Sequence, residues 1–110
     1  MCGRYTLTTN PQQIREAFPW LSVPEGPQPR YNIAPTQPVA VVPNDGLNKL
    51  DFFVWGLIPS WAKDTKIAYS TINARGDTVA TKPAFRTAFK KRRCLVLADG
   101  YYEWQKEGKA

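Results

Sequence analysis

The sequence predicts an α+β fold that is mostly antiparallel β-sheet and barrel-like, with a few short helices. Its apolar runs are short and bounded by proline, glycine, asparagine or aspartate, which is typical of strands joined by turns. Seven prolines between residues 19 and 43 exclude a long helix there, because proline lacks the amide hydrogen that a helix interior needs. Only two stretches have helical periodicity. The 110 residues suit one domain, spanning residues 1–110.

The first helix is expected in "TTNPQQIREAF". Asn10 is a good N-cap, and Pro11 suits the first helical position, where no amide hydrogen is needed. Ile14, Ala17 and Phe18 share one face of such a helix. We expect this face to pack inward.

Two strands joined by a turn are expected next. "PVAVV" and "KLDFFVWGLI" are rich in β-branched and aromatic residues. Between them, Asp45-Gly46 favours a hairpin turn, because glycine accepts a positive φ. Pro59 is expected to end the second strand.

The last elements are a helix and two strands. "PAFRTAFKKRR" predicts the second helix, with Phe85, Ala88 and Phe89 inward and the basic residues outward. "CLVLADGYYEWQ" predicts a strand, an Asp99-Gly100 turn and a final strand.

Composition restricts the function classes. Cys94 opens an apolar run and is expected in the core, as are Trp55 and Trp104. Two cysteines do not make a disulfide framework, and the absence of histidine excludes imidazole metal sites and Cys-His dyads within the chain. No metal or other cofactor is expected. "MCGRYTLTTN" lacks a long apolar stretch, so neither a signal peptide nor a membrane segment is expected.

Positive charge is concentrated in the second half of the chain. The net charge is +6; residues 61–110 carry eleven basic and five acidic side chains, whereas residues 1–60 carry four of each. A one-sided positive surface favours a polyanionic partner such as nucleic acid. A solvated surface that aids solubility explains the charge equally well, so composition alone leaves both interpretations open.

Cys2 directly follows the initiator methionine, in "MCGRYT". Methionine removal generally requires a small second residue, and cysteine qualifies, so the mature chain would begin with an α-amine and a thiol two carbons apart. Their ordinary pKa values, about 7.7–8.0 and about 8.5, leave both partly deprotonated near neutral pH. Such a pair converts an aldehyde to an imine and then, intramolecularly, to a thiazolidine ring. Acyl transfer is its other natural chemistry, and an inert, frayed terminus is the alternative.

Four separated stretches together resemble one family. They are "MCGRYT" at the start, "RYNIAPTQ" from Arg30, "WGLIPSWAKD" from Trp55 through "INARGDT" from Ile72, and "ADGYYEW" from Ala98. In this order and spacing, the chain resembles the SRAP family (SOS response-associated peptidase-like proteins). The resemblance implies the SRAP fold, covalent thiazolidine capture of abasic sites in single-stranded DNA, and self-removal of residues ahead of the cysteine. It also implies a DNA damage role, in the bacterial cytoplasm with the nucleoid or in a eukaryotic nucleus.

The resemblance implies a catalytic set. Cys2 matches the nucleophile, Asn73 in "INAR" the asparagine that hydrogen-bonds the opened sugar, and Glu103 in "YYEW" the acid/base carboxylate. An amide offers donors and an acceptor to a hydroxyl, and aromatic neighbours are expected to desolvate Glu103 and raise its pKa. Without the resemblance, Asn73 would be interpreted as a turn residue and Glu103 as an outward-facing strand residue.

For DNA binding, the resemblance implies Arg4 and Arg75 as phosphate contacts, Asn32 and Pro35 in "YNIAP" as a loop lining the site, and Trp61 as an aromatic on which a base stacks. Each arginine would otherwise be a surface salt-bridge partner. The "KKRR" run is expected to aid binding through its charge rather than through a specific contact.

The chain departs from the family pattern in its length. Family domains continue beyond the equivalent of Ala110 and there supply a catalytic histidine, whereas this chain contains no histidine. We therefore expect an incomplete fold, completed by a missing C-terminal part or a second chain.

Two other functions stay open. Glutamine amidotransferases with an N-terminal cysteine nucleophile also begin with methionine, cysteine and glycine, but the Asn-Gly pair of their oxyanion element is absent here. The second is a non-catalytic, basic single-stranded-DNA-binding module in which Cys2 is inert.

Overall fold

The computed structural model describes residues 2–24 and 28–103. The strands and helices of these residues are β1 (Tyr5–Leu7), α1 (Pro11–Ala17), β2 (Arg30–Ile33), β3 (Pro38–Pro43), β4 (Asp51–Val54), the 3₁₀ helix η1 (Lys66–Ser70), α2 (Arg86–Lys91), β5 (Cys94–Val96) and β6 (Gly100–Tyr101). The α+β class expected from the sequence is confirmed. No helix within the described ranges has both the length and the apolar character needed to cross a membrane.

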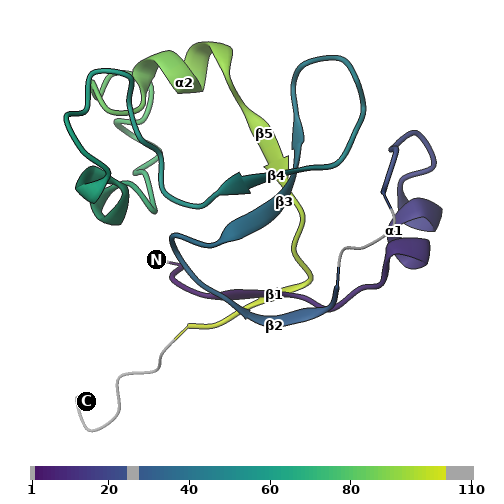
Figure 1. Ribbon diagram of the computed structural model, residues 1–110. Helices are drawn as coiled ribbons and strands as arrows, with labels where there is room; N and C mark the ends of the chain where they lie inside the picture. The colour runs from purple at the N-terminus through teal and green to yellow at the C-terminus, as the bar shows by residue number, and fades with distance from the viewer. Residues whose placement is uncertain (1, 25–27, 104–110) are drawn as a thin grey trace, which may run out of the picture.

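The strands form two three-stranded antiparallel sheets. Their strand orders are β2-β1-β6 and β4-β3-β5. In Figure 1 the sheet of β3 and β4 lies above that of β1 and β2, with α1 at one side and α2 at the other. The expected barrel-like closure is wrong, because within residues 2–24 and 28–103 the two sheets share no strand pairing that would join their edges.

One hydrophobic core joins the two sheets. Ile33 of β2 and Val41 of β3 are its most deeply buried large side chains. The four consecutive residues Val39–Val42 are all buried, so both faces of β3 are covered. The other buried members of this core are Tyr5, Leu7, Ile14, Leu21, Val23 and Leu50.

Helix α1 begins as the sequence predicts. The Asn10 side chain accepts a hydrogen bond from the Gln13 amide, the Gln13 side chain accepts one from the Asn10 amide, and Pro11 is the first helical residue. Of the face expected to be buried, Ile14 is buried, whereas Phe18 is partly exposed against the Trp20 ring. The helix is therefore attached to the core mainly through Ile14.

The turn between β3 and β4 is confirmed, but the second strand is shorter than expected. Gly46 has φ +79°, and the Asp45 carboxylate accepts a hydrogen bond from the Leu47 amide. β4 ends at Val54, well before Pro59. The reason is Gly56.

Gly56 ends β4 because the chain passes close to η1 there. Its φ is +121°, and a Cβ at this position would lie 2.9 Å from the backbone oxygen of Ala68. Only glycine fits this approach without a shift of the backbone. The strand prediction missed it because the contact joins residues that are distant in sequence.

The final strands do not form a hairpin. β5 pairs with β3 and β6 pairs with β1, so the connection between them crosses from one sheet to the other. Helix α2 forms, but Phe85, Ala88 and Phe89 are only half-buried. The core position expected for Cys94 is wrong, because β5 is an edge strand whose open face leaves Cys94 exposed. Trp104 lies outside the described residues.

Asp99 ties this crossing connection to the N-terminal strand. Its carboxylate accepts hydrogen bonds from the Thr6 hydroxyl at 2.6 Å and from the backbone amides of Thr8 and Thr9 at 2.6 and 2.8 Å. The Thr8 and Thr9 hydroxyls also donate to it. These donors, the Thr6 hydroxyl above all, hold the pKa of Asp99 well below its usual range. The carboxylate therefore helps to fix β1, from which Cys2 extends.

Candidate functional site

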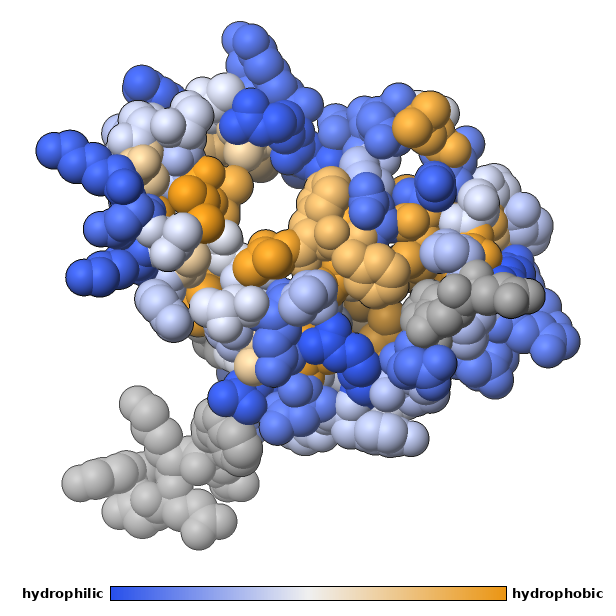
Figure 2. Space-filling model, in the orientation of Figure 1, coloured by the Kyte–Doolittle hydropathy of each residue, from blue (hydrophilic) through white to orange (hydrophobic). Residues whose placement is uncertain are grey.

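A cavity of about 1290 Å³ lies on one face of the β4-β3-β5 sheet. Val39 and Val41 of β3 line it, and so do their cross-strand partners, Phe53 of β4 and Val96 of β5. Because alternate strand residues face the same side, this lining is one continuous face of the sheet. Figure 2 shows the hollow, with apolar side chains gathered around it.

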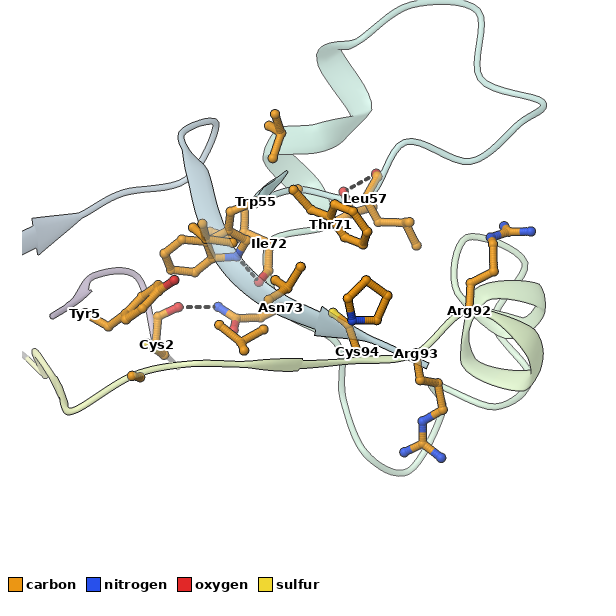
Figure 3. Close-up of a pocket in the computed structure, with 18 of the residues that line it drawn as sticks. Cys2, Tyr5, Trp55, Leu57, Thr71, Ile72, Asn73, Arg92, Arg93 and Cys94 are labelled. Atoms are coloured by element: carbon orange, nitrogen blue, oxygen red, sulfur yellow. Dashed lines mark hydrogen bonds between the residues drawn. The ribbon is translucent and has the colours of Figure 1, made fainter. Parts of the chain in front are cut away.

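The two ends of this cavity differ chemically. Cys2, Tyr5 and Asn73 lie at one end, while Arg92 and Arg93 follow α2 at the other (Figure 3). The Arg93 guanidinium lies 4.4 Å from the centre of the Phe89 ring. The cavity therefore has an end that carries the Cys2 thiol, an apolar floor and a positively charged rim.

Cys2 and Asn73 meet directly at one end of the cavity. The side-chain amide of Asn73 donates a 2.7 Å hydrogen bond to the backbone carbonyl of Cys2. The Cys2 thiol is half-buried and is 3.6 Å from the Arg4 carbonyl oxygen, a weak contact. The bond to Asn73 holds the start of the chain in the cavity, where a free terminus would otherwise fray.

A partly buried hydrogen-bond network holds the segment just before Asn73. The Trp55 indole donates to the Ile72 carbonyl at 2.8 Å, and the buried Thr71 hydroxyl contacts the Leu57 carbonyl at 2.6 Å. These bonds fasten the segment before Asn73 to the segment after β4 (Figure 3). The asparagine is therefore positioned by the hydrogen bonds of the residues before it and by its own bond to Cys2 rather than by a regular element.

Arg4 and Asn32 form a second, neighbouring site. The Arg4 guanidinium donates to the Asn32 side-chain oxygen at 3.1 Å. Both line a pocket of about 580 Å³ together with Gly3, Tyr31 and Tyr102. The Tyr102 hydroxyl contacts the Tyr31 carbonyl at 2.8 Å. An arginine and two aromatic rings here provide groups that suit phosphate and bases.

The other residues expected from the sequence line neither pocket. Arg75 forms an exposed ion pair with Asp77 at 3.0 Å. Trp61 is 60% exposed, and Pro35 is half-buried in the loop between β2 and β3. Glu103 is exposed, so the aromatic shielding expected around its carboxylate is not observed. The roles implied for these four residues stay predictions.

Several site residues were missed by sequence reasoning. Tyr5 lies beside Cys2 in the cavity, and Tyr31 and Tyr102 flank Arg4. The signal for the tyrosines was their place inside the quoted motifs, one or a few positions from residues already singled out. Asp99 was interpreted only as a turn residue, and no local pattern indicates its bonds to Thr6, Thr8 and Thr9.

The comparison with protein-family models identifies the family of this chain. The SOS response associated peptidase (SRAP) family model matches residues 1–110. The chain belongs to the SRAP family. The expected resemblance is thereby confirmed over the entire sequence.

Relatives of this SRAP chain share a common description. It is 47% identical over 109 residues to the abasic site processing protein YoqW of Bacillus subtilis, covering 96% of this chain and 49% of YoqW. It is 34% identical over 133 residues to the abasic site processing protein HMCES of Xenopus tropicalis, covering 97% of this chain and 40% of HMCES. The chain thus spans about half the length of YoqW and 40% of the length of HMCES.

A solved structure supports the same fold. The SRAP chain matches a crystal structure of a Bacteroides thetaiotaomicron protein with a TM-score of 0.75 and 25% identity, covering 99% of this chain and 51% of that one.

In the described part of this chain, no group of three or more cysteine, aspartate or glutamate side chains is arranged to hold a metal ion.

Proposed function

We propose that this chain captures abasic sites in single-stranded DNA as a covalent thiazolidine at Cys2. The relatives named as abasic site processing proteins support the substrate class. The observation that carries the proposal is the hydrogen bond from Asn73 to the Cys2 carbonyl, because it holds the aminothiol residue in a cavity beside a neutral amide.

The proposed reaction uses both groups of Cys2. Removal of Met1, for which a self-processing route fits the family description as a peptidase, frees the α-amine. The amine attacks the aldehyde carbon of the ring-opened abasic sugar, and the resulting carbinolamine loses water to give an imine. The Cys2 thiol then adds across the carbon–nitrogen double bond, its sulfur bonding to carbon and its proton ending on nitrogen. The net change is one thiazolidine formed and one water released.

The charged and aromatic surface around Cys2 suits a DNA strand. Arg4 and Asn32 line the pocket next to Cys2 together with two exposed aromatic residues, Tyr31 at 67% and Tyr102 at 42%. Exposed aromatic rings bind bases of any sequence by stacking, and a guanidinium binds the phosphates between them. Basic side chains after α2 add long-range attraction at the far rim of the cavity.

Intact mass spectrometry tests the proposed function directly. The purified chain is incubated with a single strand that carries one abasic site, then with the same strand carrying an ordinary nucleotide. We expect the first mixture to contain a species with the mass of the mature chain plus the DNA minus one water. A mass that retains Met1 and shows no adduct would refute the proposal.

Arg75 is expected to contact phosphate once DNA is bound. Its exposed pair with Asp77 contributes little in water, so exchanging it for phosphate costs little. Arg75→Ala is expected to weaken single-strand binding and to reduce the slope of log affinity against log salt by about 0.7, the value for one phosphate contact. Fluorescence anisotropy over a salt series measures both.

A matched control separates contact from overall charge. Arg86 carries the same charge, but the family motifs imply a phosphate contact only for Arg75 of these two, so Arg86→Ala should leave the salt slope nearly unchanged. Equal slopes for the two variants would contradict a specific Arg75 contact.

We also propose that polypeptide equivalent to the second half of SRAP relatives covers the cavity face, as a continuation of the chain or as a second chain. Phe53 and Val96 leave apolar surface exposed there, at 44% and 52%. Apolar surface of this kind, gathered on one sheet face, is typical of an interface. The solved relative is about twice as long as the matched region, which supplies a candidate cover.

The covering proposal is tested by mixing this chain with the part of YoqW that lies outside the alignment. We expect a one-to-one complex in size-exclusion chromatography and a higher melting temperature than the chain alone. Val96→Lys should weaken the complex at least about tenfold, since it places a charge on the buried face. Leu95→Lys, on the opposite face of β5, is the control and should bind normally. Equal binding by both variants would show that this face is not the interface.

A further inference from the structure

The Tyr5 hydroxyl is buried without a hydrogen-bond partner among the residues that the structure describes. The side chain is 6% exposed, and its oxygen is the one buried side-chain polar atom there that lacks a partner. Buried hydroxyl groups are normally hydrogen-bonded, because leaving one unpaired costs free energy. An exception of this kind needs an explanation.

The ring cannot easily turn away to relieve this cost. Tyr5 lies on β1, the central strand of its sheet, and pairs with Ile33 of β2 on one side and with Tyr101 of β6 on the other. The Trp55 ring packs against it edge to face, with 5.5 Å between ring centres. The phenol is therefore held in place by backbone pairing and by an aromatic contact.

Tyr5 lies at the same end of the cavity as Cys2 and Asn73. All three residues line the same cavity, and Figure 3 shows them grouped at one end of it. Burial raises the pKa of Tyr5, nearby Arg30 lowers it, and the charge of the Cys2 thiolate raises it, so the two side chains are within electrostatic range. At neutral pH the group is a phenol that can donate a hydrogen bond.

A neutral donor on a residue close to Cys2 suits one step of the proposed reaction. When the amine attacks an aldehyde, the carbon–oxygen π electrons move to the oxygen, which gains negative charge before it is protonated. A fixed donor lowers the energy of that state, as in an oxyanion hole. Asn73 already directs an amide hydrogen to the Cys2 carbonyl, whereas the Tyr5 hydroxyl is uncommitted among the described residues.

We propose that Tyr5 is a catalytic residue whose hydroxyl donates a hydrogen bond to the aldehyde oxygen while the Cys2 amine attacks. This inference rests on the proposed function for its substrate. The proton that the oxygen gains comes from the attacking amine, the oxygen leaves as water, and Tyr5 is unchanged at the end. The donor acts on a feature that every aldehyde shares, so the proposal can be tested with and without DNA.

The test compares Tyr5→Phe with the parent chain, both carrying Cys94→Ala so that Cys2 is the only thiol. Three rates are measured: crosslinking to abasic single-stranded DNA, thiazolidine formation with propanal, and alkylation of Cys2 by iodoacetamide. We expect Tyr5→Phe to slow both aldehyde reactions at least about tenfold. Alkylation should be unchanged, because it attacks no carbonyl carbon and charges no carbonyl oxygen.

The outcomes separate this inference from the proposed function. Unchanged aldehyde rates in Tyr5→Phe would overturn the role of Tyr5, even if the parent chain crosslinks DNA. Equal slowing of alkylation would also overturn it, since the hydroxyl would then act on the sulfur. A parent chain that reacts with propanal but not with abasic DNA would refute the proposed function, while slow propanal capture by Tyr5→Phe would still support Tyr5.

Protein stability provides a further check. Because phenylalanine keeps the ring and removes an unpaired buried hydroxyl, the melting temperature of Tyr5→Phe should be equal to or higher than that of the parent. A clearly lower melting temperature would show that the hydroxyl has a partner in the free protein, which contradicts the proposal.

Discussion

A Cys2→Ala variant will form no stable adduct with single-stranded DNA that carries an abasic site. Alanine is also small enough to allow methionine removal, so the α-amine is retained and only the sulfur is lost. The amine can still form an imine, but without the thiol the imine hydrolyses instead of closing to a ring. We expect at least a hundredfold loss of adduct on denaturing gels.

A reducing agent separates the roles of the two groups of Cys2. Borohydride converts an imine to a stable amine, so Cys2→Ala should give an adduct with borohydride and none without it. Cys94→Ala is the matched control, because Cys94 lies toward the α2 end of the cavity and should crosslink normally (Figure 3). An undiminished adduct from Cys2→Ala without reductant would refute the thiazolidine mechanism. Glutamine hydrolysis that needs no DNA would favour the amidotransferase alternative.

Asp99→Asn is expected to have the largest effect on stability. The carboxylate accepts five hydrogen bonds from Thr6, Thr8 and Thr9, and four of them converge on one oxygen, Oδ2. An amide replaces one of the two oxygens with a donor, which would face hydrogen atoms that need an acceptor. Because Asp99 is exposed to solvent, we expect a loss of about 2–3 kcal/mol rather than the full sum of five bonds. For a chain of this size, this corresponds to about 10–15 °C in melting temperature.

The stabilisation by Asp99 should depend on pH. Its pKa is lower in the folded chain than in the unfolded chain, so the folded state favours the ionised form. The contribution is therefore complete above the unfolded value of about 3.9 and is lost as the pH falls toward the lower folded value. The parent chain should lose stability below about pH 4, and Asp99→Asn should lose less over the same range.

Asp45→Asn is the matched control for Asp99. It removes the same charge, but asparagine keeps the oxygen that accepts from the Leu47 amide, so stability should change by less than about 0.5 kcal/mol. Urea unfolding followed by circular dichroism measures both variants. Equal losses for Asp99→Asn and Asp45→Asn would show that the bonds at Asp99 contribute no more than those of an ordinary turn.

Local elements of the fold could be predicted because their causes are local. The capping box of Asn10 and Gln13 and the Asp45-Gly46 turn each depend on residues within a few positions of one another. The early end of β4 could not be predicted, since it depends on the approach of Gly56 to Ala68. The pairing partners of β5 and β6 could not be predicted either, because the residues of a strand do not specify which distant strand it pairs with.

The sequence by itself determined which groups are available for chemistry: a cysteine directly after the initiator methionine, the motifs of the SRAP family and a basic second half. These are properties of covalent structure and residue order, so they are present before folding. Only the tertiary structure decided which groups meet. It placed Asn73 against Cys2, left Glu103 and Arg75 outside both pockets, and buried the Tyr5 hydroxyl beside the cavity without a partner among the described residues. Such meetings depend on contacts across about 70 residues of chain, and no local pattern specifies them.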